Sequence, residues 1–165
     1  TYKIGIPIGN YTSQFFANIY LNELDHFIKE KLRVKFYVRY MDDFILILDN
    51  KESAIKAKER ISEFLQNRLH LKLNKKTNYF KCSQGVKFCG FHVYTNKIKL
   101  LNQNKKKIYK KVKHWNKLYS KNELDIMRTA ECFKAWLGHA SLGNDYKYIR
   151  KIKRKCNWYY MEGET

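Results

Sequence analysis

The chain has 165 residues, 44% of them hydrophobic and 30% charged, which excludes a disordered tail and allows one folded domain or slightly more. Its 34 Lys and Arg against 15 Asp and Glu give a formal net charge of +19, and this excess predicts a polyanionic partner. No apolar run approaches the roughly 20 residues of a membrane-spanning helix, so a membrane partner is not expected.

The charged residues are unevenly distributed. Residues 1–50 carry six basic and six acidic side chains, residues 51–100 carry 12 and three, and residues 101–165 carry 16 and six. The excess of positive charge therefore lies in residues 51–165, after the first third of the chain. Thirteen Tyr, ten Phe and three Trp add flat surfaces for bases, although most aromatic side chains of a domain belong to its core.

The cysteines, at positions 82, 89, 132 and 156, show no Cys-x-x-Cys spacing, and the sequence shows no secretory signal. We therefore expect reduced, buried thiols in a reducing compartment, the cytoplasm. Cys82, Cys89 and His92 are poorly spaced for a zinc site. Because the chain starts at Thr1 without an initiator Met, we expect it to be a piece of a longer protein.

The chain opens on a short loop with two glycines around Pro7, and a helix is predicted over 12–32. Asn10 or Thr12 can cap this helix. Its apolar side chains recur at spacings of three and four. They are Phe15, Phe16, Ile19, Leu24, Phe27, Ile28 and Leu32.

Two short apolar runs, 34–38 and 44–48, then flank the adjacent acids Asp42 and Asp43. This pattern predicts a tight hairpin, because side chains along a straight strand alternate between faces and only a turn lets both carboxylates converge. After the hairpin, Asn50 is expected to cap a second amphipathic helix over 51–69.

Short alternating patterns over 71–100 predict small antiparallel strands, with turns near Asn74, around 83–85 and at 95–96. Helical periodicity returns over 104–119, 123–139 and 145–160. Three helices joined by short loops predict a compact bundle. The fold class is therefore α+β, with a junction near residue 101.

Asp42 and Asp43 are the candidate catalytic residues. Carboxylate oxygens are preferred by Mg²⁺, which nucleotidyl transfer uses to activate the attacking hydroxyl and to neutralise phosphate charge. Mn²⁺ is an alternative ion. The competing interpretation is a solvated turn without a metal, since Asp is common in turns.

Four stretches resemble, in the same order, motifs of reverse transcriptases. Tyr40-Met-Asp-Asp43 resembles the catalytic turn. Gly5-Ile-Pro-Ile-Gly-Asn-Tyr-Thr-Ser-Gln14, followed by Phe-Phe-Ala-Asn-Ile-Tyr-Leu, resembles the loop and helix beneath the template base and incoming nucleotide. Leu73-Asn-Lys-Lys-Thr77 resembles the lysine-bearing motif, and Phe88-Cys-Gly-Phe91 resembles the hairpin called the primer grip. The resemblance covers residues 5–100.

Most members of that family have Gln at the position of Ile8. An apolar residue at this position is similar to what the reverse transcriptases of diversity-generating retroelements have there. The stretch Trp136-Leu-Gly-His-Ala140 also resembles that branch of the family. The resemblance implies an error-prone enzyme that miscopies template adenines. An amide can hydrogen-bond the nascent pair whereas isoleucine offers only apolar contact. The alternative is that Ile8 is a neutral packing change.

The resemblance implies an antiparallel-sheet palm with two packed helices over residues 1–100, followed by a three-helix thumb bundle over 101–165. Asp42 is expected to bind the metal directly, with Asp43 as second ligand or electrostatic support. Lys76, or Lys75, could protonate the departing pyrophosphate, unless both are ordinary solvated lysines. The expected nucleotide and template contacts are Pro7, Ile8, Gly9, Ser13, Gln14, Tyr40 and Met41.

In the second hairpin, Gly90 is expected to approach the primer backbone, whereas Phe88 and Phe91 are expected to pack, next to Cys89. Lysines on the first thumb helix suit duplex phosphates. They are Lys105, Lys106, Lys107, Lys110, Lys111 and Lys113. His114 and His139 are expected to be packing or helix-end residues, and Trp115, Trp136 and Trp158 to form the bundle core.

The expected partners are an RNA template, a DNA primer and dNTPs, with an accessory protein as an open possibility. In this family a further catalytic Asp precedes the Gly5 loop, so the chain alone is expected to bind nucleic acid but to polymerise poorly. A missing strand would leave a sheet edge on which the chain could dimerise. The alternatives are a group II intron or abortive-infection reverse transcriptase, and a catalytically silent RNA-binding module.

Overall fold

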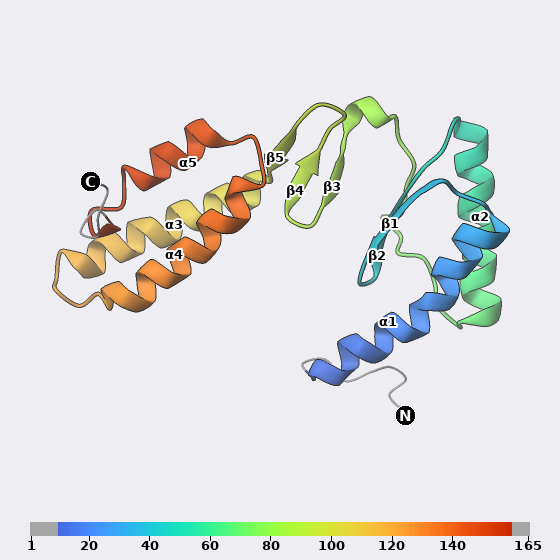
Figure 1. Ribbon diagram of the computed structural model, residues 1–165, viewed down its shortest axis with the longest axis horizontal. Helices are drawn as coiled ribbons and strands as arrows, with labels where there is room; N and C mark the ends of the chain where they lie inside the picture. Colours follow the sequence, from blue (N-terminus) through green and yellow to red (C-terminus); the bar gives the residue numbers. More distant parts are fainter. Residues whose placement is uncertain (1–9, 160–165) are drawn as a thin grey trace. The chain divides into compact units, whose positions relative to one another are not determined.

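The computed structural model describes residues 10–159 of the chain (Figure 1). It combines helices with two small antiparallel sheets, which confirms the α+β class. The chain divides into two compact units, residues up to Lys81 and residues from Cys82 onward. Within the described residues, no helix is both long and apolar enough to cross a membrane.

Helix α1 of the first unit, Tyr11–His26, continues into a π-helical turn, Phe27–Lys31. The helix predicted over 12–32 is confirmed. The Leu32 N–H donates to the Phe27 carbonyl at 3.0 Å, and the Val34 N–H donates to the Ile28 carbonyl at 3.1 Å. Arg33 between them has φ 52°, so a left-handed residue ends the helix and turns the chain toward the hairpin.

The predicted hairpin is confirmed as strands β1, Phe36–Tyr40, and β2, Asp43–Ile47. Tyr40 pairs with Asp43, and Phe36 pairs with Ile47 at the other end. Helix α2, Lys51–Arg68, follows, and the Asn50 side chain accepts the Ser53 N–H at 2.8 Å. The predicted cap is therefore present, and it satisfies one of the free N–H groups of the first turn.

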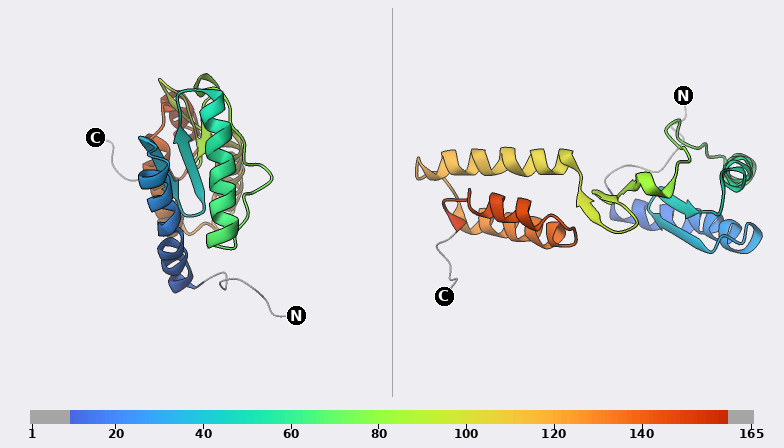
Figure 2. Two further views of the ribbon diagram at one scale, coloured as in Figure 1. Left: turned by 90° about the vertical axis from the view of Figure 1, so that its right-hand side faces the viewer. Right: turned by 90° about the horizontal axis from the view of Figure 1, so that it is seen from above.

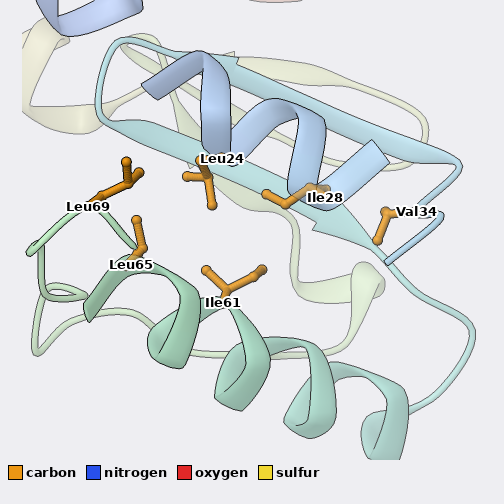
Figure 3. Packing of buried hydrophobic residues seen from close by; sticks show 6 residues of the cluster. All are labelled: Leu24, Ile28, Val34, Ile61, Leu65 and Leu69. Carbon is orange, nitrogen blue, oxygen red and sulfur yellow. The ribbon is translucent and has the colours of Figure 1, made fainter. Parts of the chain in front are cut away.

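The core of the first unit lies between α1, α2 and the hairpin (Figure 3). Each of its buried side chains contributes up to about 1.5–3 kcal/mol relative to exposure to water. They are Leu24, Ile28, Val34, Ile61, Leu65 and Leu69. Phe27 stacks on Phe64 at the edge of this cluster, with ring centroids 4.2 Å apart.

The segment between α2 and residue 81 contains no strand, so the prediction of strands beginning at Leu71 is wrong for this stretch. It runs instead as an irregular chain tied to α2. The Lys58 ammonium donates to the Thr77 carbonyl at 2.9 Å, and the Thr77 N–H donates to the Asn74 carbonyl at 2.9 Å. The predicted turn at Asn74 is thus present without the flanking sheet.

In the second unit, a three-stranded antiparallel sheet is formed by β3, Val86–Phe88, β4, Phe91–Val93, and β5, Ile98–Leu100. A 3₁₀ turn, Cys82–Gln84, precedes it. These strands and the turn at 94–97, closed by a 2.8 Å bond from the Tyr94 N–H to the Lys97 carbonyl, confirm the second part of the strand prediction.

The three predicted helices are observed as α3, Asn102–Tyr119, α4, Ile126–Ser141, and α5, Tyr146–Lys153 (Figure 2). The last is shorter than the 145–160 predicted. Their core holds Trp158 and Phe133, both fully buried, with Trp115 and Trp136 packed against it. The tryptophans therefore belong to the bundle core, as predicted.

The cysteines are all free, but only Cys156 is buried; Cys82, Cys89 and Cys132 are exposed. The prediction of four buried thiols is therefore wrong at three positions. Cys82 lies in the 3₁₀ turn, Cys89 in a hairpin turn and Cys132 on the outer side of α4. Burial raises the pKa of the Cys156 thiol to about 12, so this thiol stays protonated at neutral pH.

Candidate active site

The Asp42–Asp43 turn is a two-residue connection, because Tyr40 and Asp43 form the last strand pair and leave Met41 and Asp42 as the loop. Met41 has φ 57°, a left-handed conformation that costs a residue with a side chain of order 1 kcal/mol. The side chains of Tyr40, Asp42 and Asp43 are exposed. The turn therefore presents both carboxylates to solvent, where an ion or a nucleotide can reach them.

Arg39, the last inward-facing residue of β1, ties this turn to helix α1. One terminal nitrogen of its guanidinium donates to the Met41 carbonyl and to Asn18 Oδ1, both at 2.9 Å. The Asn18 amide also lies 3.8 Å from the Met41 sulfur. The left-handed turn residue is thus held through both its carbonyl and its side chain.

The rest of the Arg39 guanidinium is anchored on Asp25 of α1. Arg39 Nε donates to Asp25 Oδ1 at 2.8 Å and Nη2 donates to Oδ2 at 2.5 Å, a two-point contact. The Tyr37 hydroxyl donates to the same Oδ1 at 2.6 Å. Because both partners are largely shielded from water, this pair is stronger than an ion pair on the open surface.

The pKa values of this group follow from these contacts. Burial raises the pKa of Asp25, but hydrogen bonds from Arg39 and Tyr37 lower it more, so the net pKa lies below the usual range. The hydrogen bond to Asp25 raises the pKa of Arg39. Burial, and then the Asp25 carboxylate, raise the pKa of Tyr37. The three groups are therefore a stable anion, cation and neutral donor at neutral pH.

Asp42 and Asp43 fit a magnesium ion that completes its coordination with water and substrate. Mg²⁺ commonly takes one or two carboxylates and keeps waters or phosphate oxygens in the other positions. Among residues 10–159, no cluster of three or more His, Cys, Asp or Glu side chains is present. Of the described residues, Asp42 and Asp43 would thus be the ligands, with water or phosphate oxygens in the other positions.

The family model for reverse transcriptase (RNA-dependent DNA polymerase) matches residues 1–93, a range that includes the whole hairpin and α1. The chain belongs to the reverse transcriptase family. No curated protein matches the chain. The matched range ends within the second unit, at the last residue of β4, so α3, α4 and α5 lie beyond it.

The residues predicted to lie under the nucleotide are only partly within the described structure of this reverse transcriptase chain. Pro7, Ile8 and Gly9 lie outside the described residues. Ser13 and Gln14 lie in the first turn of α1, where the Ser13 N–H donates to the Asn10 carbonyl at 3.1 Å. Asn10 takes the N-cap position by its backbone, without a side-chain bond. The nucleotide contacts of this turn stay a prediction.

Lys75 and Lys76 follow α2 in the irregular segment. The backbone N–H of Lys76 donates to Asn74 Oδ1 at 3.0 Å, and its side chain is exposed. Lys75 lines an open cavity of about 750 Å³ along α2, together with Glu59 and Glu63. In the described part of the chain, no hydrogen bond or ion pair joins either lysine to Asp42 or Asp43. A role for either lysine toward pyrophosphate stays a prediction.

The predicted primer-grip residues form the turn between β3 and β4. Cys89 has φ 46° and Gly90 has φ 86°, the two positive values that a tight type I′ hairpin needs. A Cβ at Gly90 would meet Asn104 Nδ2 at 3.0 Å and His139 Nε2 at 3.2 Å. The glycine is therefore explained by the turn and by packing against α3 and α4, whether or not a primer binds.

Of the two aromatic residues of this hairpin, Phe91 packs as predicted. Phe91 is buried with Leu100 and Ala140, and its ring lies 4.6 Å from that of His139. Phe88 is half-buried. His139 is exposed, but it lies in the last turn of α4 with its ring against Phe91, which confirms the prediction of a packing or helix-end residue. His114 is exposed within α3 and not in its last turn, so the same prediction is wrong for His114.

The six predicted phosphate-binding lysines all lie on α3, but they are not equivalent. Lys105 is half-buried, and its ammonium donates to the buried Asp145 carboxylate at 2.8 Å. The other five side chains are exposed. Helical spacing places Lys106, Lys110 and Lys113 on one flank and Lys107 and Lys111 on the other. The helix therefore offers two separate rows of positive charge.

Sequence reasoning missed Asn18, Asp25 and Arg39. Alternation along β1 argued against them, because Phe36, Val38 and Tyr40 form the more apolar face, yet these three side chains are exposed and Tyr37 and Arg39 face inward. A charged residue at such a position requires a partner. The partner lies 14 residues earlier in the chain, in the middle of an apolar helix face, which no local spacing rule indicates.

Proposed function

We propose that this chain carries the catalytic turn and the nucleic-acid-binding helices of an RNA-directed DNA polymerase. The observation that carries the proposal is the exposed Asp42–Asp43 turn, fixed to α1 by Arg39, in a range that matches the reverse transcriptase family. The proposed partners are an RNA template, a DNA primer and dNTPs.

The chemistry assigned to the turn is nucleotidyl transfer. Asp42 and Asp43 would hold Mg²⁺, which when bound favours ionisation of the primer hydroxyl and neutralises charge on the phosphates. Tyr40 and Met41 would lie beside the primer end. The exposed Lys76 is proposed to donate a proton to the pyrophosphate as it leaves. The Arg39 contacts keep the turn in one conformation, which precise placement of the reacting groups requires.

We assign residues 1–100 to a partial palm and residues 101–165 to a thumb. This functional division differs from the division into compact units, which places β3–β5 with α3–α5. The assignment follows the motif order and the charge of the last 65 residues.

Free cysteines throughout the described residues are compatible with a reducing compartment.

We also propose that the enzyme is of the diversity-generating retroelement type. Ile8 and the run from Trp136 to Ala140 support this subtype over a group II intron enzyme. An apolar side chain at position 8 removes one hydrogen-bonding group from the template site and so weakens discrimination. Replacing Ile8 with Gln should lower misincorporation opposite template adenine, measured by sequencing of the products. Unchanged error rates would contradict the subtype but not the polymerase class.

The polymerase class itself is tested by primer extension with the protein expressed from its complete reading frame. A DNA primer annealed to an RNA template should be extended in the presence of Mg²⁺ and all four dNTPs. A catalytically silent RNA-binding module, which the net charge of +19 also allows, would bind the same substrate without extending it. Absence of any extension would therefore favour the binding module.

A further inference from the structure

Helices α3 and α5 enclose a groove of about 270 Å³ that the catalytic turn does not use. Its floor is formed by the rings of Tyr109 and Tyr148 and by Ile152, and its rim carries four lysines. The lysines are Lys105, Lys106, Lys110 and Lys151. An apolar, aromatic floor beneath a basic rim matches the two chemistries of a nucleotide, a flat base and an anionic phosphate.

The groove is built from fixed contacts between the helices and does not depend on surface side chains alone. The Tyr148 hydroxyl donates to the Lys105 carbonyl at 2.7 Å, and the Asn116 amide donates to the Lys155 carbonyl at 2.6 Å. The Lys105 ammonium is held by Asp145 and lies 5.4 Å from the centre of the Tyr148 ring. Contacts of Lys105 and Tyr148 thus fix two lining residues of the groove, and the Asn116 bond adds a further tie between α3 and the residues after α5.

The remaining rim charges are unengaged. Within residues 10–159, the side chains of Lys106, Lys110 and Lys151 form no hydrogen bond or ion pair, and all three residues are exposed. The Tyr109 ring is 45% exposed, with the Lys155 ammonium 5.6 Å from its centre. A phosphate between these lysines would find donors that have no competing partner.

We propose that this groove binds a nucleotide of an unpaired nucleic-acid strand, with a base or sugar on Tyr109 and the adjoining phosphate on Lys106, Lys110 and Lys151. This inference rests on the proposed function, because it names the partner of one part of the basic helices. The bases of a duplex are stacked inside it, so a duplex would touch the lysines but leave the aromatic floor empty. A single strand can use both.

The test compares binding of two labelled probes to the 165-residue chain by fluorescence anisotropy at one salt concentration. One probe is an unpaired oligouridine of about 12 nucleotides, and the other is an RNA–DNA duplex of about the same length. The groove variant Lys106→Gln/Lys110→Gln is matched by Lys107→Gln/Lys111→Gln, which removes the same charge with the same spacing from the other flank of α3. Tyr109→Ala and Tyr109→Phe separate stacking from charge.

The variant Lys106→Gln/Lys110→Gln should weaken oligouridine binding at least tenfold, because these two lysines line the groove beside Tyr109. The control variant Lys107→Gln/Lys111→Gln should weaken it less than threefold. Tyr109→Ala should lower the affinity for oligouridine about tenfold and leave the affinity for the duplex unchanged. Tyr109→Phe should bind both probes as the unaltered chain does. Circular dichroism confirms folding of each variant.

Equal losses from the groove and control pairs, or a Tyr109→Ala loss shared by the duplex, would overturn the groove assignment. In that case intact duplex binding would leave the proposed function standing. A chain that binds neither probe would contradict both proposals.

Discussion

Arg39 of β1 and Asp25 of α1 form a two-point ion pair, with Nε to Oδ1 at 2.8 Å and Nη2 to Oδ2 at 2.5 Å, and the same guanidinium donates to the Met41 carbonyl in the β1–β2 turn. Helix α1 thus holds the turn through one side chain. Met41 adopts its left-handed conformation in the presence of this support, so we expect the pair to stabilise both the first unit and the geometry of the turn.

A double-mutant cycle with Arg39→Lys and Asp25→Asn measures this pair. Lysine keeps the charge but cannot make the two-point contact or reach three partners at once. We expect a coupling free energy of about 1–3 kcal/mol, typical of shielded, charged hydrogen bonds. Hydrogen exchange of the α1 and α2 amides gives the free energy of unfolding of this unit. The exposed pair His26 and Glu30 on the same helix is the control and should couple less. Equal coupling in both pairs would refute the role of Arg39.

The pH dependence of stability should carry the signature of Asp25. Its pKa is lower in the folded than in the unfolded chain, so the unfolded state binds the proton more readily. The stabilisation is therefore complete above the unfolded value of about 3.9 and is lost as the pH falls through the folded value. Asp25→Asn should remove the part of the fall in the free energy of unfolding at low pH that comes from Asp25. The matched change at an exposed acid, Asp49→Asn, should leave that part in place. Identical acid profiles for the two variants would show that Asp25 is not the linked group.

Gly90→Ala should destabilise the second unit by about 1–3 kcal/mol, because Gly90 has φ 86° and a Cβ would meet Asn104 Nδ2 at 3.0 Å. Gly138→Ala is the matched control. Gly138 lies within α4, where a Cβ would meet no neighbouring atom within 4 Å, so alanine should be neutral or stabilise by up to about 1 kcal/mol.

Urea unfolding followed by tryptophan fluorescence measures both variants. It reports on the second unit alone, because all three tryptophans, at 115, 136 and 158, belong to that unit. Similar midpoints for the two variants would contradict this explanation of Gly90.

Asp145 joins the sheet to the helices of the second unit. It is 6% exposed and accepts the Leu100 N–H at 2.6 Å and the Lys105 ammonium at 2.8 Å. Asp145→Ala should lower the free energy of unfolding by about 3 kcal/mol, since it leaves a buried N–H and a partly buried cation without a partner. Glu123→Ala, at an exposed acid, should change it by less than about 0.5 kcal/mol. A small loss at Asp145 in the same fluorescence assay would show that water replaces the carboxylate.

The parts of the fold that were predicted correctly are those with local signals. Helix α2 follows from Asn50 and an apolar stripe of period 3.6, and the β1–β2 hairpin follows from two apolar runs around a polar pair. Residues 71–81 also show alternating apolar and polar residues, but they have no neighbouring strand to pair with among the described residues. Alternation alone therefore gave a wrong prediction. Strand formation depends on a partner that the local sequence does not identify.

The sequence indicated the candidate residues of the site, whose chemistry stays a prediction, but not the residues that hold the turn in place. Asp42, Asp43 and Met41 were identified from the motif, whereas Asn18, Asp25 and Arg39 depend on contacts between a helix and a strand 14 or more residues apart. The buried Asp145 depends in the same way on residues 40 and 45 positions away. The groove between α3 and α5 likewise required the packing of two helices, because Tyr109 and Lys151 are ordinary surface residues in the sequence.

The most direct test of the account is the rate of single-nucleotide addition by the complete protein carrying Asp42→Asn, which keeps the shape of the side chain and removes its charge. On a DNA primer and RNA template with Mg²⁺, we predict a loss of at least about 1,000-fold, because metal binding and charge neutralisation fail together. Asp49→Asn, an exposed acid just beyond β2, should extend the primer at the rate of the unaltered protein. Extension by Asp42→Asn at that same rate would contradict the assignment of the turn as the catalytic site.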